Sequence, residues 1–120
     1  MKKILLVEDD PFLIDIYTTK FRDSGFEIEV IKNGEGAFDE IKKICPDVVL
    51  LDIILPQVSG WEILKELKND AKLKKIKVII LSNLGQEEEI KKGNNLGADK
   101  YIVKAYYTPA EVVEEVRKIS

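Results

Sequence analysis

The chain has 120 residues, a net charge of −3 from 19 Lys and Arg against 22 Asp and Glu, and a hydrophobic content of 45%. These values predict one globular domain over residues 1–120 with a single core. The absence of histidine excludes imidazole as a catalytic base or zinc ligand. With Cys45 as the only cysteine, no intrachain disulfide can form, and a reducing cytoplasm is the expected location.

Nucleic acid and membranes are not expected partners. The charge balance is slightly acidic, and the basic stretch over residues 72–77 is interrupted by Leu73 and Ile76. No apolar run approaches the roughly 20 residues of a membrane helix, and Met1-Lys2-Lys3 is followed by only four apolar residues before Glu8. We therefore expect neither a membrane span nor a secretion signal.

The predicted elements alternate between strand and helix along the chain. Residues 4–7 form an apolar run, after which Asp10 and Pro11 supply an N-cap and a first-turn proline for a helix that ends at Gly25. A second strand is predicted over residues 27–31, and its residues 27–30 alternate between charged and apolar side chains, as an edge strand does. The remaining elements are helices over about residues 35–44, 61–67 and 87–96, strands over residues 48–51, 77–81 and 101–103, and a last helix that opens with the capping box 108–111.

This spacing predicts a doubly wound α/β fold: one five-stranded parallel sheet with helices on both faces. The runs at 4–7, 48–51 and 78–81 are continuously apolar, so we expect them in the centre of the sheet. The last helix reaches Ser120, and we expect no output domain within the chain.

Polar side chains follow four of the five predicted strands. The carboxyl ends of parallel strands meet at one edge of the sheet, where such sheets bind ligands. The residues concerned are Glu8, Asp9 and Asp10 after the first strand, Asp52 after the third, Ser82 after the fourth and Lys104 after the fifth.

These residue types indicate a metal-assisted phosphoryl transfer. A single acid at a strand end is more often a cap or a surface charge, but acids that converge repel one another unless a pKa rises or a cation binds. Oxygen ligands without nitrogen or sulfur favour Mg²⁺. A cation, the Lys104 ammonium and the Ser82 hydroxyl around one carboxylate suit phosphoryl transfer, and the carboxylate of Asp52 can itself be the nucleophile.

The whole chain resembles a response-regulator receiver domain of two-component signalling, of the single-domain chemotaxis-regulator kind. The residues that carry this resemblance are the pair Glu8-Asp9, Asp52, Pro56 and Gly60 in the following loop, Ser82 and Lys104. Successive separations are 43, 30 and 22 residues along the series Asp9, Asp52, Ser82 and Lys104. Each motif alone is weak, but their order and spacing over the chain are specific.

The resemblance implies a flavodoxin-like receiver fold and a role for each of these residues. Asp52 would be the phosphorylated aspartate, and Ser82 and Lys104 would hold the phosphoryl oxygens. Tyr101 takes the place of the family's switching aromatic and would act with Ser82. The implied Mg²⁺ ligands are Asp9, Asp52, the backbone carbonyl of Ile54 and, directly or through a water, Glu8.

The resemblance also implies the partners. The phosphoryl group would come from a histidine kinase or a histidine phosphotransfer protein, and a downstream protein of unknown identity would read the altered surface. The protein would catalyse only its own phosphorylation and dephosphorylation, so it is not expected to be an enzyme that acts on another substrate.

Several positions depart from the family pattern. Ala105 stands where proline is usual, and we predict a trans peptide bond before it because a cis bond without proline costs about 2.5 to 4 kcal/mol. Asn83 is larger than the usual residue and would narrow the access to the phosphoacceptor. Ile54 and Leu84 cannot hydrogen-bond an attacking water, which predicts a long-lived phosphorylated form.

Three alternative functions fit less of the sequence. A binding module of the same fold that has lost phosphorylation would not take Mg²⁺ or a phosphoryl analogue at Asp52. An aspartate-nucleophile phosphatase expects its nucleophile at position 8 or 10 and leaves Asp52 unexplained. A flavodoxin-like cofactor carrier needs a glycine-rich phosphate loop after the first strand, where this chain has acids that repel phosphate.

Overall fold

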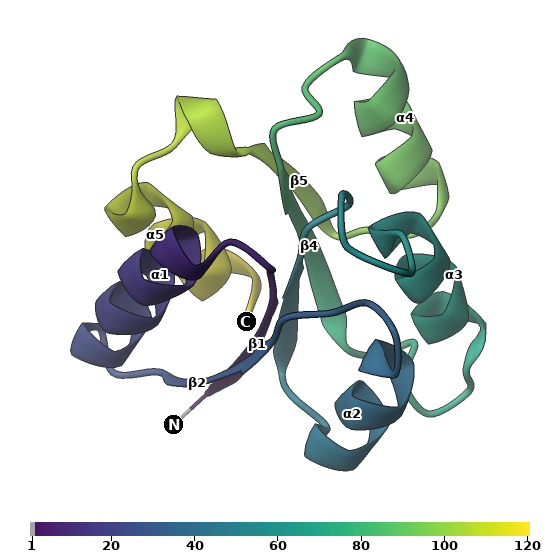
Figure 1. Ribbon diagram of the computed structural model, residues 1–120, viewed down its shortest axis with the longest axis horizontal. Coiled ribbons are helices and arrows are strands. Elements are labelled where there is room, and N and C mark those ends of the chain that lie inside the picture. The colour runs from purple at the N-terminus through teal and green to yellow at the C-terminus, as the bar shows by residue number, and fades with distance from the viewer. Residues whose placement is uncertain (1) are drawn as a thin grey trace.

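The computed structural model describes residues 2–120 as a five-stranded parallel sheet between two layers of helices (Figure 1). The strands are β1 (Lys3–Val7), β2 (Glu27–Ile31), β3 (Val48–Leu51), β4 (Lys77–Ser82) and β5 (Lys100–Val103). Their order in the sheet is β2-β1-β3-β4-β5. This order confirms the predicted fold class, the three central apolar strands and the position of β2 at an edge.

The helices agree with the sequence pattern except at some of their ends. They are α1 (Pro11–Asp23), α2 (Ala37–Ile44), α3 (Gly60–Asn69), α4 (Glu87–Asn95) and α5 (Pro109–Ile119), and a short 3₁₀ helix, η1 (Lys104–Tyr106), follows β5. Helix α2 begins two residues later than predicted, because its N-cap Gly36 has a left-handed backbone with φ 77°. No helix within residues 2–120 combines the length and the apolar character needed to cross a membrane.

Alternation along the central strands builds two cores, one on each face of the sheet. In β1, Ile4 and Leu6 pack with helices α1 and α5, while Leu5 and Val7 pack with α2 and α3. Figure 1 shows α1 and α5 on one side of the sheet and α2, α3 and α4 on the other. Each fully buried side chain of this size contributes about 1.5 to 3 kcal/mol. Both faces of the central strands are therefore covered, as their continuous apolar character predicted.

Helix caps fix the loops on either side of the functional edge. The Asp10 carboxylate accepts a hydrogen bond from the Phe12 N–H (2.9 Å) and starts α1 directly after β1. Before α5, Thr108 and Glu111 form the predicted capping box, with reciprocal side-chain to backbone bonds of 3.1 and 2.8 Å. Both helices therefore begin close to the strand ends that carry the polar residues.

The first residue of α3, Gly60, packs against the loop that follows β3. A Cβ atom on Gly60 would lie 2.2 Å from the carbonyl oxygen of Asp52, which explains why the loop requires glycine at this position. The Gly60 N–H donates a hydrogen bond to the carbonyl of Ile53 (2.8 Å). On the other side of the loop, a Cβ atom on Gly34 would lie 2.3 Å from the carbonyl oxygen of Val58. These close approaches fix the loop backbone at two places, at Asp52 and at Val58.

The peptide bond between Lys104 and Ala105 is trans, as predicted, and none of the peptide bonds in residues 2–120 is cis. The chain continues from β5 directly into η1, where the backbone N–H of Tyr107 donates to the carbonyl of Lys104 (3.4 Å).

Candidate functional site

A cleft of about 310 Å³ opens at the carboxyl edge of the sheet. It is bounded by residues that follow β1, β3, β4 and β5, namely Glu8, Asp9, Asp10, Leu13, Asp52, Ile54, Ser82, Asn83 and Lys104. Every site residue predicted from the sequence lies here except Tyr101. A larger and mostly apolar groove of about 510 Å³ between α1 and the start of α5 holds none of the strand-end groups. The chemistry is therefore expected in the smaller cleft.

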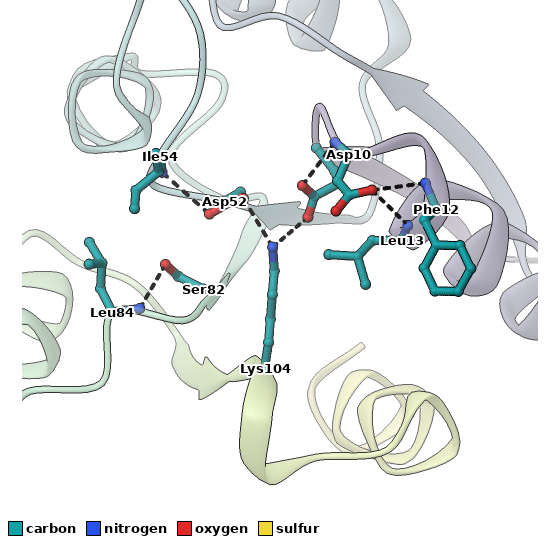
Figure 2. A network of polar contacts seen from close by, with 9 residues as sticks. Asp10, Phe12, Leu13, Asp52, Ile54, Ser82, Leu84 and Lys104 are labelled. Atoms are coloured by element: carbon teal, nitrogen blue, oxygen red, sulfur yellow. Dashed lines mark hydrogen bonds and ion pairs between the residues drawn. The ribbon is translucent and has the colours of Figure 1, made fainter.

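The Lys104 ammonium is held between two carboxylates at the centre of this cleft (Figure 2). Its Nζ atom lies 2.6 Å from Oε1 of Glu8 and 3.0 Å from Oδ2 of Asp52. Only 9% of the lysine side chain is exposed, and both acids are buried. Such short, charge-assisted contacts are stronger than neutral hydrogen bonds and satisfy charges that would otherwise be costly to bury.

The pKa values of Glu8 and Lys104 are both raised, but for different reasons. Burial raises the pKa of Glu8, and the nearby charge of Asp52 raises it further, while the hydrogen bond from Lys104 opposes both. Burial alone would lower the pKa of Lys104, but its hydrogen bond to Glu8 and the charge of Asp52 outweigh this effect and raise it. Lys104 is therefore charged at neutral pH, and Glu8 binds a proton more readily than an exposed glutamate does.

Asp52 lies at the base of the cleft with each carboxylate oxygen engaged. Oδ2 accepts from Lys104, and Oδ1 accepts a hydrogen bond from the backbone N–H of Ile54 (3.3 Å). The Asp52 N–H donates to the carbonyl of Val7 (3.1 Å), which extends the pairing of β3 with β1 by one residue. The side chain of Ile54 is 63% exposed, so it lies at the rim of the cleft and not in the core.

Ser82 is buried on the opposite wall and is linked to Tyr101 through the backbone of Leu84. The Ser82 Oγ accepts a hydrogen bond from the Leu84 N–H (3.2 Å). The Tyr101 hydroxyl donates to the carbonyl of Leu84. Burial raises the pKa of Tyr101 and the charge of Glu89 adds to the increase, while a hydrogen bond with the Ser82 side chain opposes it. Tyr101 is half-buried and does not line the cleft.

Three acids come together in a way that suits a divalent cation. Glu8, Asp9 and Asp52 each offer a carboxylate oxygen, and these atoms lie within 4.8 Å of one another. Among the hydrogen bonds of residues 2–120, none uses the carbonyl oxygen of Ile54, so this predicted ligand is also available. Hard oxygen donors of this kind fit Mg²⁺. Asp10 has a separate role, since its carboxylate caps α1 (Figure 2).

Two residues that contribute to the site, Leu13 and Leu84, were not identified as such from the sequence. Leu13 lines the cleft, and its side chain also packs against the core on the α1 and α5 face of the sheet. The backbone of Leu84 connects Ser82 with Tyr101, and no side-chain pattern can reveal a contribution from main-chain atoms.

Comparison with known proteins identifies the family of this chain. The profile of the response regulator receiver domain matches residues 4–117. The chain belongs to this family. Because the match covers nearly the whole chain, the receiver domain accounts for the described sheet, its helices and the cleft at the strand ends.

Individual relatives agree with this assignment. The chain is 34% identical over 109 residues to the phosphate regulon transcriptional regulatory protein PhoB of Rhizobium meliloti, covering 91% of this chain and 48% of the relative. It is 33% identical to the DNA-binding response regulator MtrA of Mycolicibacterium smegmatis, covering 97% and 49%. A DNA-binding response regulator of the LuxR family from Staphylococcus aureus superposes with a TM-score of 0.90 at 30% identity, covering 99% and 98%. The receiver domain thus spans about half the length of the two curated relatives.

The first prediction concerns Asp9. Asp9→Ala should weaken Mg²⁺ binding at least about tenfold, since even partners of metal ligands contribute tenfold or more. Thermal stability should be retained or increased, because one charge leaves a repulsive cluster. Titration calorimetry with MgCl₂ measures the affinity, and Asp39→Ala, an exposed acid in α2, is the control for the same change of charge. Unchanged Mg²⁺ affinity in Asp9→Ala would remove Asp9 from the site.

The second prediction concerns pH. Because the pKa of Glu8 is raised above 4.5, protons compete with a cation for this carboxylate at a higher pH than at an ordinary glutamate. The Mg²⁺ affinity of the parent should therefore fall as pH decreases through the raised pKa. In Glu8→Gln, which cannot titrate, this part of the decline should be missing. Calorimetric titrations between pH 8 and about pH 5 would measure both profiles, and superimposable profiles would contradict the prediction.

Proposed function

We propose that this receiver domain is a phosphoacceptor that takes a phosphoryl group onto Asp52 with the help of Mg²⁺. The observation that carries the proposal is the position of the Asp52 carboxylate, buried at the base of a cleft between the ammonium of Lys104 and two further acids. A nucleophile, a fixed positive charge and an oxygen-rich cation site are the parts that phosphoryl transfer requires.

In the proposed reaction a carboxylate oxygen of Asp52 forms a bond to phosphorus as the bond from phosphorus to the donor nitrogen breaks. The product is an acyl phosphate, and the electron pair of the broken bond remains on the donor. Lys104, 3.0 Å from Asp52, is near enough to contact the phosphoryl oxygens. Ser82 carries a hydroxyl that can donate to one of them while it still accepts from Leu84. When bound, Mg²⁺ would neutralise charge on the transferred group.

The side chains around the cleft support a protein as the phosphoryl donor. The exposed large hydrophobic side chains within residues 2–120 are Phe12 (73%), Ile54 (63%) and Tyr106 (76%). They follow β1, β3 and β5, so all three belong to the edge that holds Asp52. Because the chain contains no histidine, the phosphohistidine must come from another molecule, a histidine kinase or a histidine phosphotransfer protein.

We further propose that Ser82 and Tyr101 transmit the change to a downstream protein and that the protein hydrolyses its own acyl phosphate. The exposed thiol of Cys45 fits a reducing cytoplasm. The alternative, a binding module that has lost phosphorylation, has the same fold and differs only in its response to a phosphodonor.

Phosphorylation is tested by incubating the protein with Mg²⁺ and a small phosphodonor and recording its intact mass. We expect one added phosphoryl group in the parent and none in Asp52→Ala. Asp39→Ala, which removes an acid outside the cleft, should behave like the parent. A parent that gains no mass, or an Asp52→Ala variant that does, would favour the binding module or a different acceptor.

The lifetime of the phosphorylated form is tested at the rim of the cleft. Ile54 is exposed and Leu84 half-buried, and neither side chain can orient a water for attack on phosphorus. Replacing Ile54 by Asn and Leu84 by Glu should accelerate the decay on the order of tenfold, because a placed base or hydrogen-bond acceptor aids the attacking water. Decay in magnesium buffer is followed by intact mass. Equal or slower decay in the double variant would show that these positions do not control water access.

A further inference from the structure

Gly93 is a buried glycine in the last turn of α4. Glycine is among the least favourable residues in a helix, and the backbone here does not have the positive φ that would require it. The reason lies in its neighbours: a Cβ atom on Gly93 would lie 2.6 Å from Cδ1 of Ile80 and 2.9 Å from Cδ2 of Tyr101. Helix α4 therefore lies directly against the sheet and the Tyr101 ring because position 93 has no side chain.

The other end of the Tyr101 side chain is also held. Its hydroxyl donates to the carbonyl of Leu84, whose N–H donates to Ser82 Oγ (3.2 Å). A continuous series of contacts thus runs from the backbone of α4 through the tyrosine ring to the hydroxyl group in the cleft.

Burial decides how each neighbour would respond if position 93 gained a side chain. Ile80 is fully buried in the core beneath α2, α3 and α4, and closely packed interiors resist displacement. Tyr101 is only half-buried and is fixed at its far end by one hydrogen bond to Leu84. Both contacts must be relieved: the 2.6 Å contact requires the terminal methyl group of Ile80 to turn within its packed surroundings, and the 2.9 Å contact displaces the tyrosine ring.

We infer that Gly93 is a positioning residue for Tyr101: the bare backbone of α4 at this point holds the ring toward Leu84 before any phosphoryl group is present on Asp52. The functional meaning rests on the proposed role of Tyr101 in switching. In this chain, helix packing sets the orientation of Tyr101, and the phosphoryl group engages Ser82 and Lys104.

The test measures the exposure of Tyr101 in the unphosphorylated protein without Mg²⁺. NMR spectra of protein with ¹³C-labelled tyrosine rings would be recorded with a neutral gadolinium chelate, whose paramagnetic relaxation effect reports contact with solvent. Tyr17 (3% exposed) and Tyr106 (76%) are internal references for buried and exposed rings. Tyr101→Phe assigns the Tyr101 signals. In the parent, Tyr101 should lie between the two references, and in Gly93→Ala its relaxation effect should at least double toward that of Tyr106.

Two further variants separate positioning from general stability. Asn94→Ala changes an exposed neighbour on α4 to a better helix former and should leave Tyr101 as in the parent. In a Tyr101→Ala background the ring is absent, so Gly93→Ala should cost less thermal stability than it does in the parent. If Gly93→Ala alone does not fold, a folded Gly93→Ala/Tyr101→Ala protein supports the inference and an unfolded one contradicts it.

None of these measurements uses a phosphodonor, so their outcome is independent of whether Asp52 accepts a phosphoryl group. Failure of the intact-mass experiment would remove the proposed function and leave the packing of Tyr101 unaffected. Unchanged Tyr101 relaxation in a folded Gly93→Ala protein, or an equal increase in Asn94→Ala, would overturn the inference.

Discussion

The buried ammonium of Lys104 is the group on which the cleft depends. Glu8 and Asp52 are both buried and lie close together, and two such carboxylates repel each other strongly without a cation. Lys104 contacts both, at 2.6 and 3.0 Å, and so allows two acids to remain at the end of an apolar sheet. Removing one member of such a group costs about 3 to 5 kcal/mol, because a buried charge is left uncompensated.

Lys104 can reach both acids because of the order of the strands. β1 and β3 are neighbours in the sheet, so Glu8 and Asp52 follow adjacent strand ends, and β5 is separated from β3 by β4. The long side chain of Lys104 spans this distance, while the short side chain of Ser82, at the end of β4, stays clear of it. A shorter basic residue at position 104 could not make the same two contacts. The strand order and the length of the lysine side chain thus work together.

Much of this arrangement could be predicted because it depends on local signals and on strand order. The apolar runs of β1, β3 and β4 and the caps at Asp10 and Thr108 are such signals, and all five were confirmed. Once the sheet is parallel, the residues after its strands must meet at one edge.

The features that could not be predicted depend on close packing between distant segments. Gly93 resembles any tolerated helix glycine until the Tyr101 ring is placed against it, and Gly34 gives no sign of its approach to Val58. The late start of α2 depends on the left-handed backbone of Gly36, which no side chain indicates. In each case the deciding contact involves main-chain atoms or a missing side chain, and hydrophobic periodicity does not report on either.

The hydrogen bonds made by Glu8 and Asp52 leave acceptor positions on their oxygens that a cation could use. Lys104 uses Oε1 of Glu8 and Oδ2 of Asp52, while the other oxygens accept weaker backbone bonds of 3.3 Å from Asp10 and Ile54. Each carboxylate oxygen has two acceptor positions, so these contacts do not exhaust either acid. Three carboxylates lie near one ammonium, so a net negative charge remains where a metal ion could bind. Lys104 therefore lowers the free-energy cost of burying Glu8 and Asp52. The negative charge that Lys104 does not neutralise favours a metal ion in the same cleft.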